Sequence, residues 1–328
     1  MNLSSREQSP ITLAGWLFLT LAAALPAAQA QTGKWPEKPV RIIIAAGPGG
    51  GDDFVTRLIS PKLSELLGQQ FIAENRTGVG GMIGQTFVQK SPPDGYTWLL
   101  AGGSMAGARL VNANVTYDVL RDFTPVSLLE TSQFVMIVHP SVPAKNLKEY
   151  IALARARPGN MTFATLGGQM PYWNALLFNS TARIQAVEIP YKGGSDATID
   201  VMAGRVDYYF APSAAAVANK ARLRALAVTG ARRSAIFPEV PTIAEAALPG
   251  YDLPAWRSIM GPAGVRRDIV DTLNAAIRRT LAMPDVRDKM LNAGSEPAPS
   301  SPEELGKRYA AWIELFGKVA KEAGIKPQ

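Results

Sequence analysis

The sequence predicts an α/β protein of two lobes, each with a mainly parallel sheet flanked by helices. Short apolar runs alternate with segments of helical periodicity almost from end to end, which is the pattern of α/β folds. The chain has 328 residues, more than the roughly 100–200 of one domain. Because no long linker divides it, we expect the chain to cross between the lobes more than once.

The first 30 residues have the features of a secretory signal peptide. Arg6 precedes an apolar run over residues 11–25, and the small-residue pattern Ala-Gln-Ala at 28–30 marks a cleavage site after Ala30. The apolar run is shorter than the roughly 20 residues that a membrane-spanning helix needs. The sequence contains no cysteine and therefore no lipid attachment site. We expect a soluble periplasmic protein.

Periodicity places the elements of the mature chain. Apolar runs bounded by turn residues predict strands over residues 40–44, 71–74, 98–101, 134–138, 162–164, 187–189, 206–210 and 223–228. Helical spacing predicts helices over residues 147–155, 172–179 and 302–323. On the last helix we expect Tyr309, Trp312, Ile313 and Phe316 to be core residues.

Composition excludes several classes of function. The net charge of +7 suits an acidic ligand, but the basic pairs lack interleaved aromatic residues, so nucleic-acid binding is not expected. One histidine and no cysteine leave little with which to build a metal site. We expect neither a metal nor another cofactor.

A glycine-rich turn follows the strand predicted at 40–44. It runs Gly47-Pro48-Gly49-Gly50-Gly51 and leads into a helix that starts with Asp52, Asp53 and Phe54. Glycine lets a ligand approach the backbone, and a helix N-terminus offers free N–H groups to an anion. A nucleotide loop is disfavoured, because no Gly-Lys-Ser/Thr follows and Asp52 replaces a third glycine. Asp53 either caps the helix or contacts the ligand.

Two more glycine turns follow predicted strands, at residues 102–107 and 166–170. Ligands of open α/β sheets bind beyond the carboxyl ends of strands, where all three turns are placed. Each turn alone could be a simple reversal of the chain. Their recurrence predicts one shared cleft that includes Ser104 and Met105.

A serine hydrolase is the alternative function. Ser104, between Gly102 and Ala106 after a strand, approximates a nucleophile elbow, and His139 is the sole histidine available as a base. His139 precedes most of the chain, whereas the histidine of that fold comes late. Hydrolysis is therefore the weaker interpretation.

Ordered motifs along nearly the whole chain resemble one family. They are Trp35-Pro36-Glu37-Lys38-Pro39-Val40-Arg41, Glu74-Asn75-Arg76-Thr77-Gly78-Val79-Gly80-Gly81, Pro93-Asp94-Gly95-Tyr96-Thr97, Asp122-Phe123-Thr124-Pro125-Val126, Pro190-Tyr191-Lys192-Gly193, Leu226-Ala227-Val228-Thr229 and Pro238-Glu239-Val240-Pro241-Thr242. The chain resembles the substrate-binding proteins of tripartite tricarboxylate transporters, also called the Bug or TctC-like family.

The resemblance implies a periplasmic binding protein of type II, the Venus-flytrap form, which is a receptor and not an enzyme. Lobe 1 would comprise residues 31–134 and 256–328, and lobe 2 residues 135–255, with crossover strands near residues 133–138 and 255–260. The protein would be a monomer that delivers a small carboxylate to the membrane subunits of a tripartite transporter.

The resemblance also implies the binding residues. They are Gly49, Gly50, Gly51, Asp53 and Phe54 of the first turn, Ser104 and Met105 of the second, Thr165, Gly167, Gly168, Gln169 and Met170 of the third, and Tyr191 and Ala211 of lobe 2. Ala211 stands where the family often has an acid, which makes the cleft less hostile to a second carboxylate. If Phe54, Tyr172 and Trp173 lie near the cleft, an aromatic dicarboxylate such as terephthalate fits; alternatively, these rings pack the helix starts.

Overall fold

A computed structural model describes residues 34–327 of the chain. The expected signal peptide lies outside the described residues. Residues Trp35–Gln328 form one compact unit. No helix in the described part of the chain is long and apolar enough to cross a membrane.

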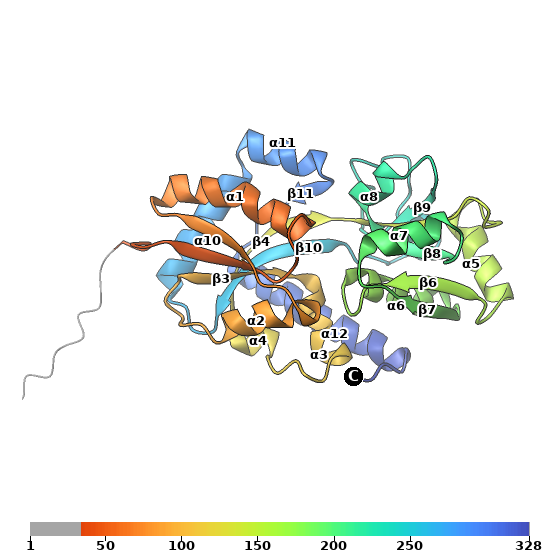
Figure 1. Cartoon of the computed structure of the whole chain (residues 1–328), viewed down its shortest axis with the longest axis horizontal. Coiled ribbons are helices and arrows are strands. Elements are labelled where there is room, and N and C mark those ends of the chain that lie inside the picture. Colours follow the sequence, from red (N-terminus) through yellow and green to blue (C-terminus); the bar gives the residue numbers. More distant parts are fainter. Residues whose placement is uncertain (1–33, 328) are drawn as a thin grey trace, which may run out of the picture. The chain divides into compact units, whose positions relative to one another are not determined.

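The first sheet has six strands in the order β11-β4-β10-β3-β1-β2. Its strands are β1 (Val40–Ile44), β2 (Phe71–Asn75), β3 (Thr97–Gly102), β4 (Phe123–Ser132), β10 (Ala255–Pro262) and β11 (Ser295–Pro297). They come from both ends of the described chain, coloured orange to yellow and blue in Figure 1. β1 pairs in parallel with β2 and β3, whereas β10 pairs antiparallel with β3 and β4, as β11 does with β4.

Alternation along β1 sends its side chains to two cores. Val40, Ile42 and Ile44 join a core with α1 (Gly51–Leu67), α10 (Arg267–Leu281) and α11 (Pro284–Asn292), while Ile43 joins the core on the other face. That other face packs against α2 (Met82–Gln89) and α12 (Pro302–Glu322). Helices on both faces explain why all residues of β1 except Arg41 are apolar.

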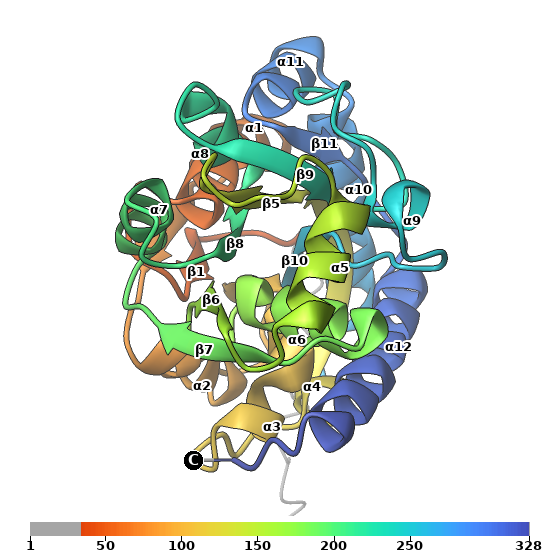
Figure 2. The same ribbon diagram turned by 90° about the vertical axis from the view of Figure 1, so that its right-hand side faces the viewer.

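The second sheet has five strands in the order β7-β6-β8-β5-β9. They are β5 (Phe134–Val138), β6 (Met161–Thr165), β7 (Ala186–Pro190), β8 (Tyr208–Pro212) and β9 (Arg224–Val228). Figure 2 shows α7 (Gly194–Met202) and α8 (Ser213–Ala218) on one side of this sheet, with α5 (Leu147–Ala156) and α6 (Met170–Ala182) on the other. Gln133 alone separates β4 of the first sheet from β5 of the second.

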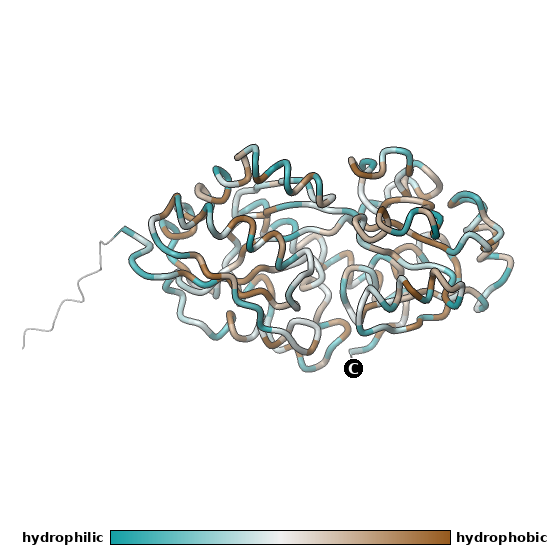
Figure 3. The backbone as a smooth tube through the Cα atoms, turned by 45° about the horizontal axis from the view of Figure 1, so that its top comes forward, coloured by the Kyte–Doolittle hydropathy of each residue, from teal (hydrophilic) through white to brown (hydrophobic). Residues whose placement is uncertain are grey.

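One core is shared by both sheets. It contains Leu99 and Leu128 of the first sheet together with Met136 and Tyr208 of the second. Apolar stretches follow the strands and alternate with hydrophilic stretches along the helices (Figure 3). The two sheets therefore do not have separate cores on this side.

The α/β class is confirmed, and each of the eight predicted strands coincides with an observed one. Each sheet is mixed rather than mainly parallel, because β5 and β10 run antiparallel to their neighbours. β10 coincides with the crossover expected near residues 255–260, whereas β4 and β11 were not predicted. Pro125 and Glu130 interrupt the apolar pattern of β4, and β11 has only three residues. The remaining short elements are η1 (Val79–Gly81), η2 (Gly103–Gly107), α3 (Ala108–Val111), α4 (Val119–Asp122) and α9 (Ile243–Ala246).

Candidate functional site

A cavity of about 690 Å³ lies where elements of the two sheets meet. All three glycine turns contribute to its wall: the first through Gly47, Pro48, Gly50, Gly51 and Asp52, the second through residues 102–104, and the third through Leu166, Gln169, Met170 and Pro171. The other lining residues include Thr77, Gly78, Gly80, Gly81, Gln85, Phe134, Gly193, Gly194, Tyr209, Trp256 and Arg257. Its volume falls within the ~300–1,000 Å³ of small-molecule sites.

The N-terminus of α1 forms one end of this cavity. Gly50 is the N-cap residue, and no side chain caps the helix. Asp53 accepts hydrogen bonds from Gly49 N–H at 3.1 Å and from Arg57 Nε at 2.9 Å. Those contacts hold the pKa of Asp53 below its ordinary value, with Arg57 the larger cause. Asp53 therefore holds the glycine turn in place, and the free N–H groups of the first turn of α1 remain available to a ligand in the cavity.

An arginine with two carboxylates borders the same end. Arg257 of β10 is paired with Glu130 of β4, which is fully buried, and with Asp52 of α1. Burial lowers the pKa of Arg257, but the two carboxylates raise it by more than burial lowers it. The pKa of Arg257 therefore lies above its ordinary value. Among the described lining residues, Arg257 is the only cation and Asp52 the only carboxylate. A Cβ atom on Gly51 would lie 2.4 Å from Arg257 Nη2, so a side chain at this position would displace the guanidinium.

A fourth glycine turn adds an oriented amide. Residues 77–81 connect β2 to α2, and Gly78, Gly80 and Gly81 all have positive φ. Gln85 follows on α2, and its Oε1 accepts a hydrogen bond from Tyr117 O–H at 2.7 Å. Because the oxygen of this amide is occupied, its NH₂ group remains available as a donor to the cavity.

The second sheet supplies two more helix starts. α6 begins after Gln169 and α7 after Gly193, and neither has a side-chain cap. Two buried groups that line the cavity, Tyr209 O–H and Trp256 Nε1–H, have no hydrogen-bond partner. The lining is thus rich in hydrogen-bond donors and suits an anionic or acceptor-rich ligand.

Five of the predicted binding residues line the cavity. They are Gly50, Gly51, Ser104, Gln169 and Met170. Three more, Met105, Gly167 and Gly168, line a smaller cavity of about 50 Å³ that shares Gly80, Gln85, Ser104 and Gln169 with the first.

The other predicted residues lie outside the lining. Gly49 contacts Asp53, as described above, and Phe54 is 38% exposed on α1. Thr165 Oγ1 donates to Glu188 Oε1 at 2.5 Å, and Tyr191 O–H donates to Asp200 Oδ2 at 2.6 Å. Ala211 is fully buried in the core between β8 and its helices.

The aromatic residues after the third turn are core residues. Trp173 has no exposed surface and stacks on Phe316 of α12 with a centroid distance of 4.2 Å and an interplanar angle of 9°. Tyr172 is also buried, edge-on to Trp173. Their position agrees with the alternative that these rings pack the helix start. Tyr309, Trp312 and Phe316 are buried as predicted.

Sequence reasoning missed several lining residues. Gly78, Gly80 and Gly81 stand in a quoted motif, and their density could have indicated a fourth ligand turn. Arg257, a lone charge within an apolar run, was a usable signal for a buried ion pair. No local pattern marks Tyr209 or Trp256, because strand pairing alone brings them to the cavity.

The structure does not bring Ser104 and His139 together. His139 Nδ1 lies 2.6 Å from Ser141 Oγ, and the ring lines a different cavity, together with Val142 and Gly204. Ser104 lines the large cavity, where no histidine is present among the described residues. Ser104 therefore lacks the base that the hydrolase alternative assigned to it.

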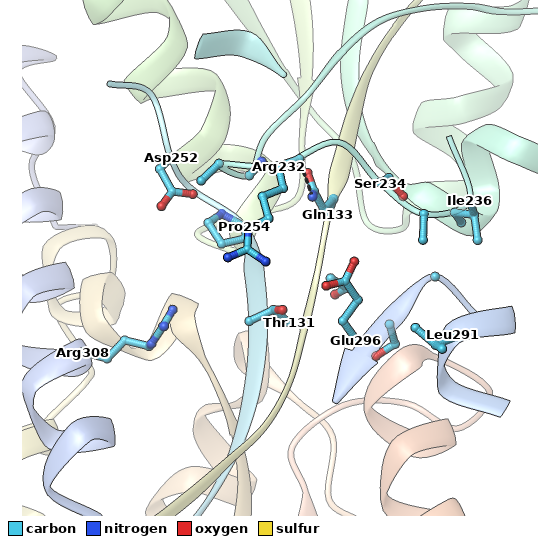
Figure 4. A pocket seen from close by; sticks show the side chains of 16 residues that line it. Thr131, Gln133, Arg232, Ser234, Ile236, Asp252, Pro254, Leu291, Glu296 and Arg308 are labelled. Atoms are coloured by element: carbon cyan, nitrogen blue, oxygen red, sulfur yellow. Dashed lines mark hydrogen bonds between the residues drawn. The ribbon is translucent and has the colours of Figure 1, made fainter. Parts of the chain in front are cut away.

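A second cavity, about 290 Å³, lies where the chain passes between the sheets (Figure 4). Gln133 Nε2 donates to Arg232 O at 2.6 Å, and Gly230 N–H donates to Gln133 Oε1 at 2.9 Å. Charged side chains of both signs, including Arg232, Asp252 and Glu296, border this space. None of the predicted binding residues lines it.

Comparisons with known proteins agree with the resemblance seen in the sequence. The model of the tripartite tricarboxylate transporter family receptor, TctC, matches residues 55–325. Protein BugT of Bordetella pertussis is 32% identical over 312 residues, which cover 93% of this chain and 95% of BugT. A solved structure described as R. palustris Rpa4515 with adipate is 32% identical with a TM-score of 0.80, covering 90% of this chain and all of that one. MatC (Rpa3494) from Rhodopseudomonas palustris with bound malate is 29% identical with a TM-score of 0.75, covering 87% and 99%.

Proposed function

The chain belongs to the tripartite tricarboxylate transporter receptor family, and from this premise we propose that it is a periplasmic receptor that captures a small carboxylate and delivers it to a tripartite transporter. The observation that carries the proposal is the convergence of three uncapped helix N-termini, those of α1, α6 and α7, on one cavity. Helix N-termini attract anions through free N–H groups and the helix dipole.

Several donors must act together to hold such a ligand. Micromolar affinity corresponds to about 8 kcal/mol. One helix terminus contributes roughly 0.3–1 kcal/mol, or up to about 2 kcal/mol when partly buried. Hydrogen bonds to a charged group add about 1.5–3 kcal/mol each. A carboxylate enclosed by donors from both sheets reaches the required sum, whereas one held by α1 alone does not.

A dicarboxylate is the specific ligand that we propose. Adipate and malate, present in two related structures, are both dicarboxylates. Phe134, Leu166, Met170 and Trp256 give the cavity apolar walls between its donor-rich ends. Such walls suit a hydrocarbon spacer, either an aliphatic chain or an aromatic ring as in terephthalate.

Capture would proceed by closure of two lobes, residues 31–134 with 256–328 and residues 135–255. Because the cavity is lined from both sheets, the ligand gains its full set of contacts only when the lobes are together. Binding then shifts the population toward the closed form, which the membrane subunits of the transporter would recognise.

A thermal-shift screen of the purified mature protein tests the proposal. Adipate, malate, terephthalate and glutamate are compared, with an esterase assay on the same sample. A ligand at 100 times its Kd adds about 2.7 kcal/mol of stability, which corresponds to a rise in Tm of several degrees. Stabilisation by a dicarboxylate without turnover is expected. Hydrolysis that disappears in Ser104→Ala, or no shift with any carboxylate, would refute the receptor function.

A further inference from the structure

Two residues that line the ligand cavity carry buried donors without partners. In the described part of the chain, five buried side-chain atoms lack a hydrogen-bond partner: Gln89 Oε1, Tyr150 Oη, Tyr209 Oη, Trp256 Nε1 and Thr280 Oγ1. Only Tyr209 and Trp256 line the cavity. Burying an unpaired polar group is costly, so its persistence at a binding site calls for a ligand that completes the bond.

Tyr209 lies on the side of the cavity formed by the second sheet. It belongs to β8, has no exposed surface and packs within the core beneath α7. Its hydroxyl lies directly under the start of α7, because a Cβ atom on Gly194 would be 3.0 Å from Tyr209 Oη. Burial raises the pKa of Tyr209 above its ordinary value, so the hydroxyl keeps its proton and remains a donor.

The groups around the Tyr209 hydroxyl favour a ligand atom that accepts hydrogen bonds. α7 has nine residues and begins after Gly193, with no side chain capping its free N–H groups. No carboxylate from the second sheet lines the cavity in the described chain; Asp52, its only acidic lining residue, is paired with Arg257 of β10. The helix start and the phenol therefore offer donors that no protein group satisfies.

We propose that Tyr209 and the N-terminus of α7 form a second carboxylate subsite, which receives the carboxylate of a dicarboxylate that is distal to α1. This inference rests on the proposed function and extends it by assigning the residue that distinguishes a diacid from a monoacid. A small movement of the Gly193–Gly194 turn brings a ligand oxygen within reach of the hydroxyl, since Gly194 has no side chain in the way.

Tyr209→Phe removes the hydroxyl and leaves the ring. Isothermal titration with adipate is expected to show a Kd at least about tenfold higher than that of the native protein, as for the loss of a hydrogen bond to a charged group. Hexanoate, which has the same chain length but one carboxylate, is expected to bind both proteins equally or to bind neither. Gly194→Ala, whose Cβ atom would crowd the hydroxyl, is expected to weaken adipate binding as well.

Tyr150→Phe is the matched control, because Tyr150 also carries a buried hydroxyl without a partner but does not line the cavity. Its adipate affinity should equal that of the native protein, and neither phenylalanine variant should unfold at a lower temperature than native. Native-like adipate binding by Tyr209→Phe would overturn the inference, as would equal weakening of adipate and hexanoate. Failure of the native protein to bind adipate, malate or terephthalate would instead contradict the proposed function.

Discussion

Gly50 and Gly51 are neighbours at the start of α1, yet a side chain would meet different surroundings at each. At Gly51 a Cβ atom would collide with the guanidinium of Arg257. At Gly50 it would find only Gly47 O, at 3.9 Å, and the φ of −83° is one that any residue adopts. A side chain at position 51 would therefore displace Arg257 from its ion pairs, whereas Gly50 keeps space open for a ligand.

Gly50→Val is expected to abolish measurable binding of dicarboxylates, because the isopropyl group would enter the space beside the first turn of α1. Its effect on unfolding should be small, about 1 kcal/mol, since valine is only a poorer N-cap residue than glycine. Titration with adipate and urea denaturation measure the two effects separately. Unchanged affinity in a folded Gly50→Val protein would show that the carboxylate does not bind at α1.

Arg257 links three secondary-structure elements through its ion pairs. Its guanidinium contacts Asp52 of α1 and Glu130 of β4 from its own position on β10, and Ser295 of β11 donates to Glu130 Oε2 at 2.5 Å. The carboxyl group of Glu130 is fully buried. A buried charge without its partner is strongly destabilising.

Arg257→Gln should therefore lower the free energy of unfolding by about 3–5 kcal/mol, because Glu130 would remain buried and unpaired. Adding Glu130→Gln should restore most of that loss, since the double variant buries two neutral amides that can hydrogen bond to each other. Urea denaturation of the two single variants and the double variant forms a double-mutant cycle. Additive losses would mean that the two side chains do not stabilise the sheet as a pair.

The strands that sequence reasoning found are rich in apolar residues. Phe134–Val138 is apolar throughout, and Val40–Ile44 is apolar except for Arg41, because helices cover both faces of their sheets. β4 escaped notice because its polar residue Glu130 is buried by pairing with Arg257 of β10, which no local pattern shows.

The candidate site divides in the same way. The glycine turns after β1, β3 and β6 could be predicted to share one cleft from sequence, because ligands of α/β sheets bind beyond the carboxyl ends of strands. Tyr209 and Trp256 could not, because their places depend on which strands pair and on which polar groups find partners within the fold. The predicted aromatic wall of Tyr172 and Trp173 failed to appear in the lining because α6 turns those rings toward α12.

At the level of the whole molecule, Trp173 connects the two sheets. Its ring extends from α6 and stacks on Phe316 of α12. It also lies against Gly107, where an added Cβ atom would be 2.2 Å from Trp173 Cζ2. Its Nε1–H donates to Gly168 O at 2.9 Å, within the third glycine turn. One side chain thus links a helix of the first sheet to a turn that faces the ligand cavity.

Because this core is continuous, the described chain should unfold in one transition rather than lobe by lobe. Calorimetry is expected to give a van't Hoff enthalpy equal to the calorimetric enthalpy for the native protein. Trp173→Ala should cost about 3–5 kcal/mol and separate the unfolding into two transitions, since it removes the contact with Phe316.

Trp98→Ala is a matched control for that variant. Trp98 is equally buried, and its Nε1–H also donates to a glycine carbonyl, that of Gly95 at 2.8 Å, but its core contains residues of the first sheet and its helices only. We expect a similar loss of stability with a single transition retained, because the connection between the sheets is untouched. Two transitions in the native protein, or one in Trp173→Ala with an unchanged enthalpy ratio, would show that the aromatic stack does not couple the sheets.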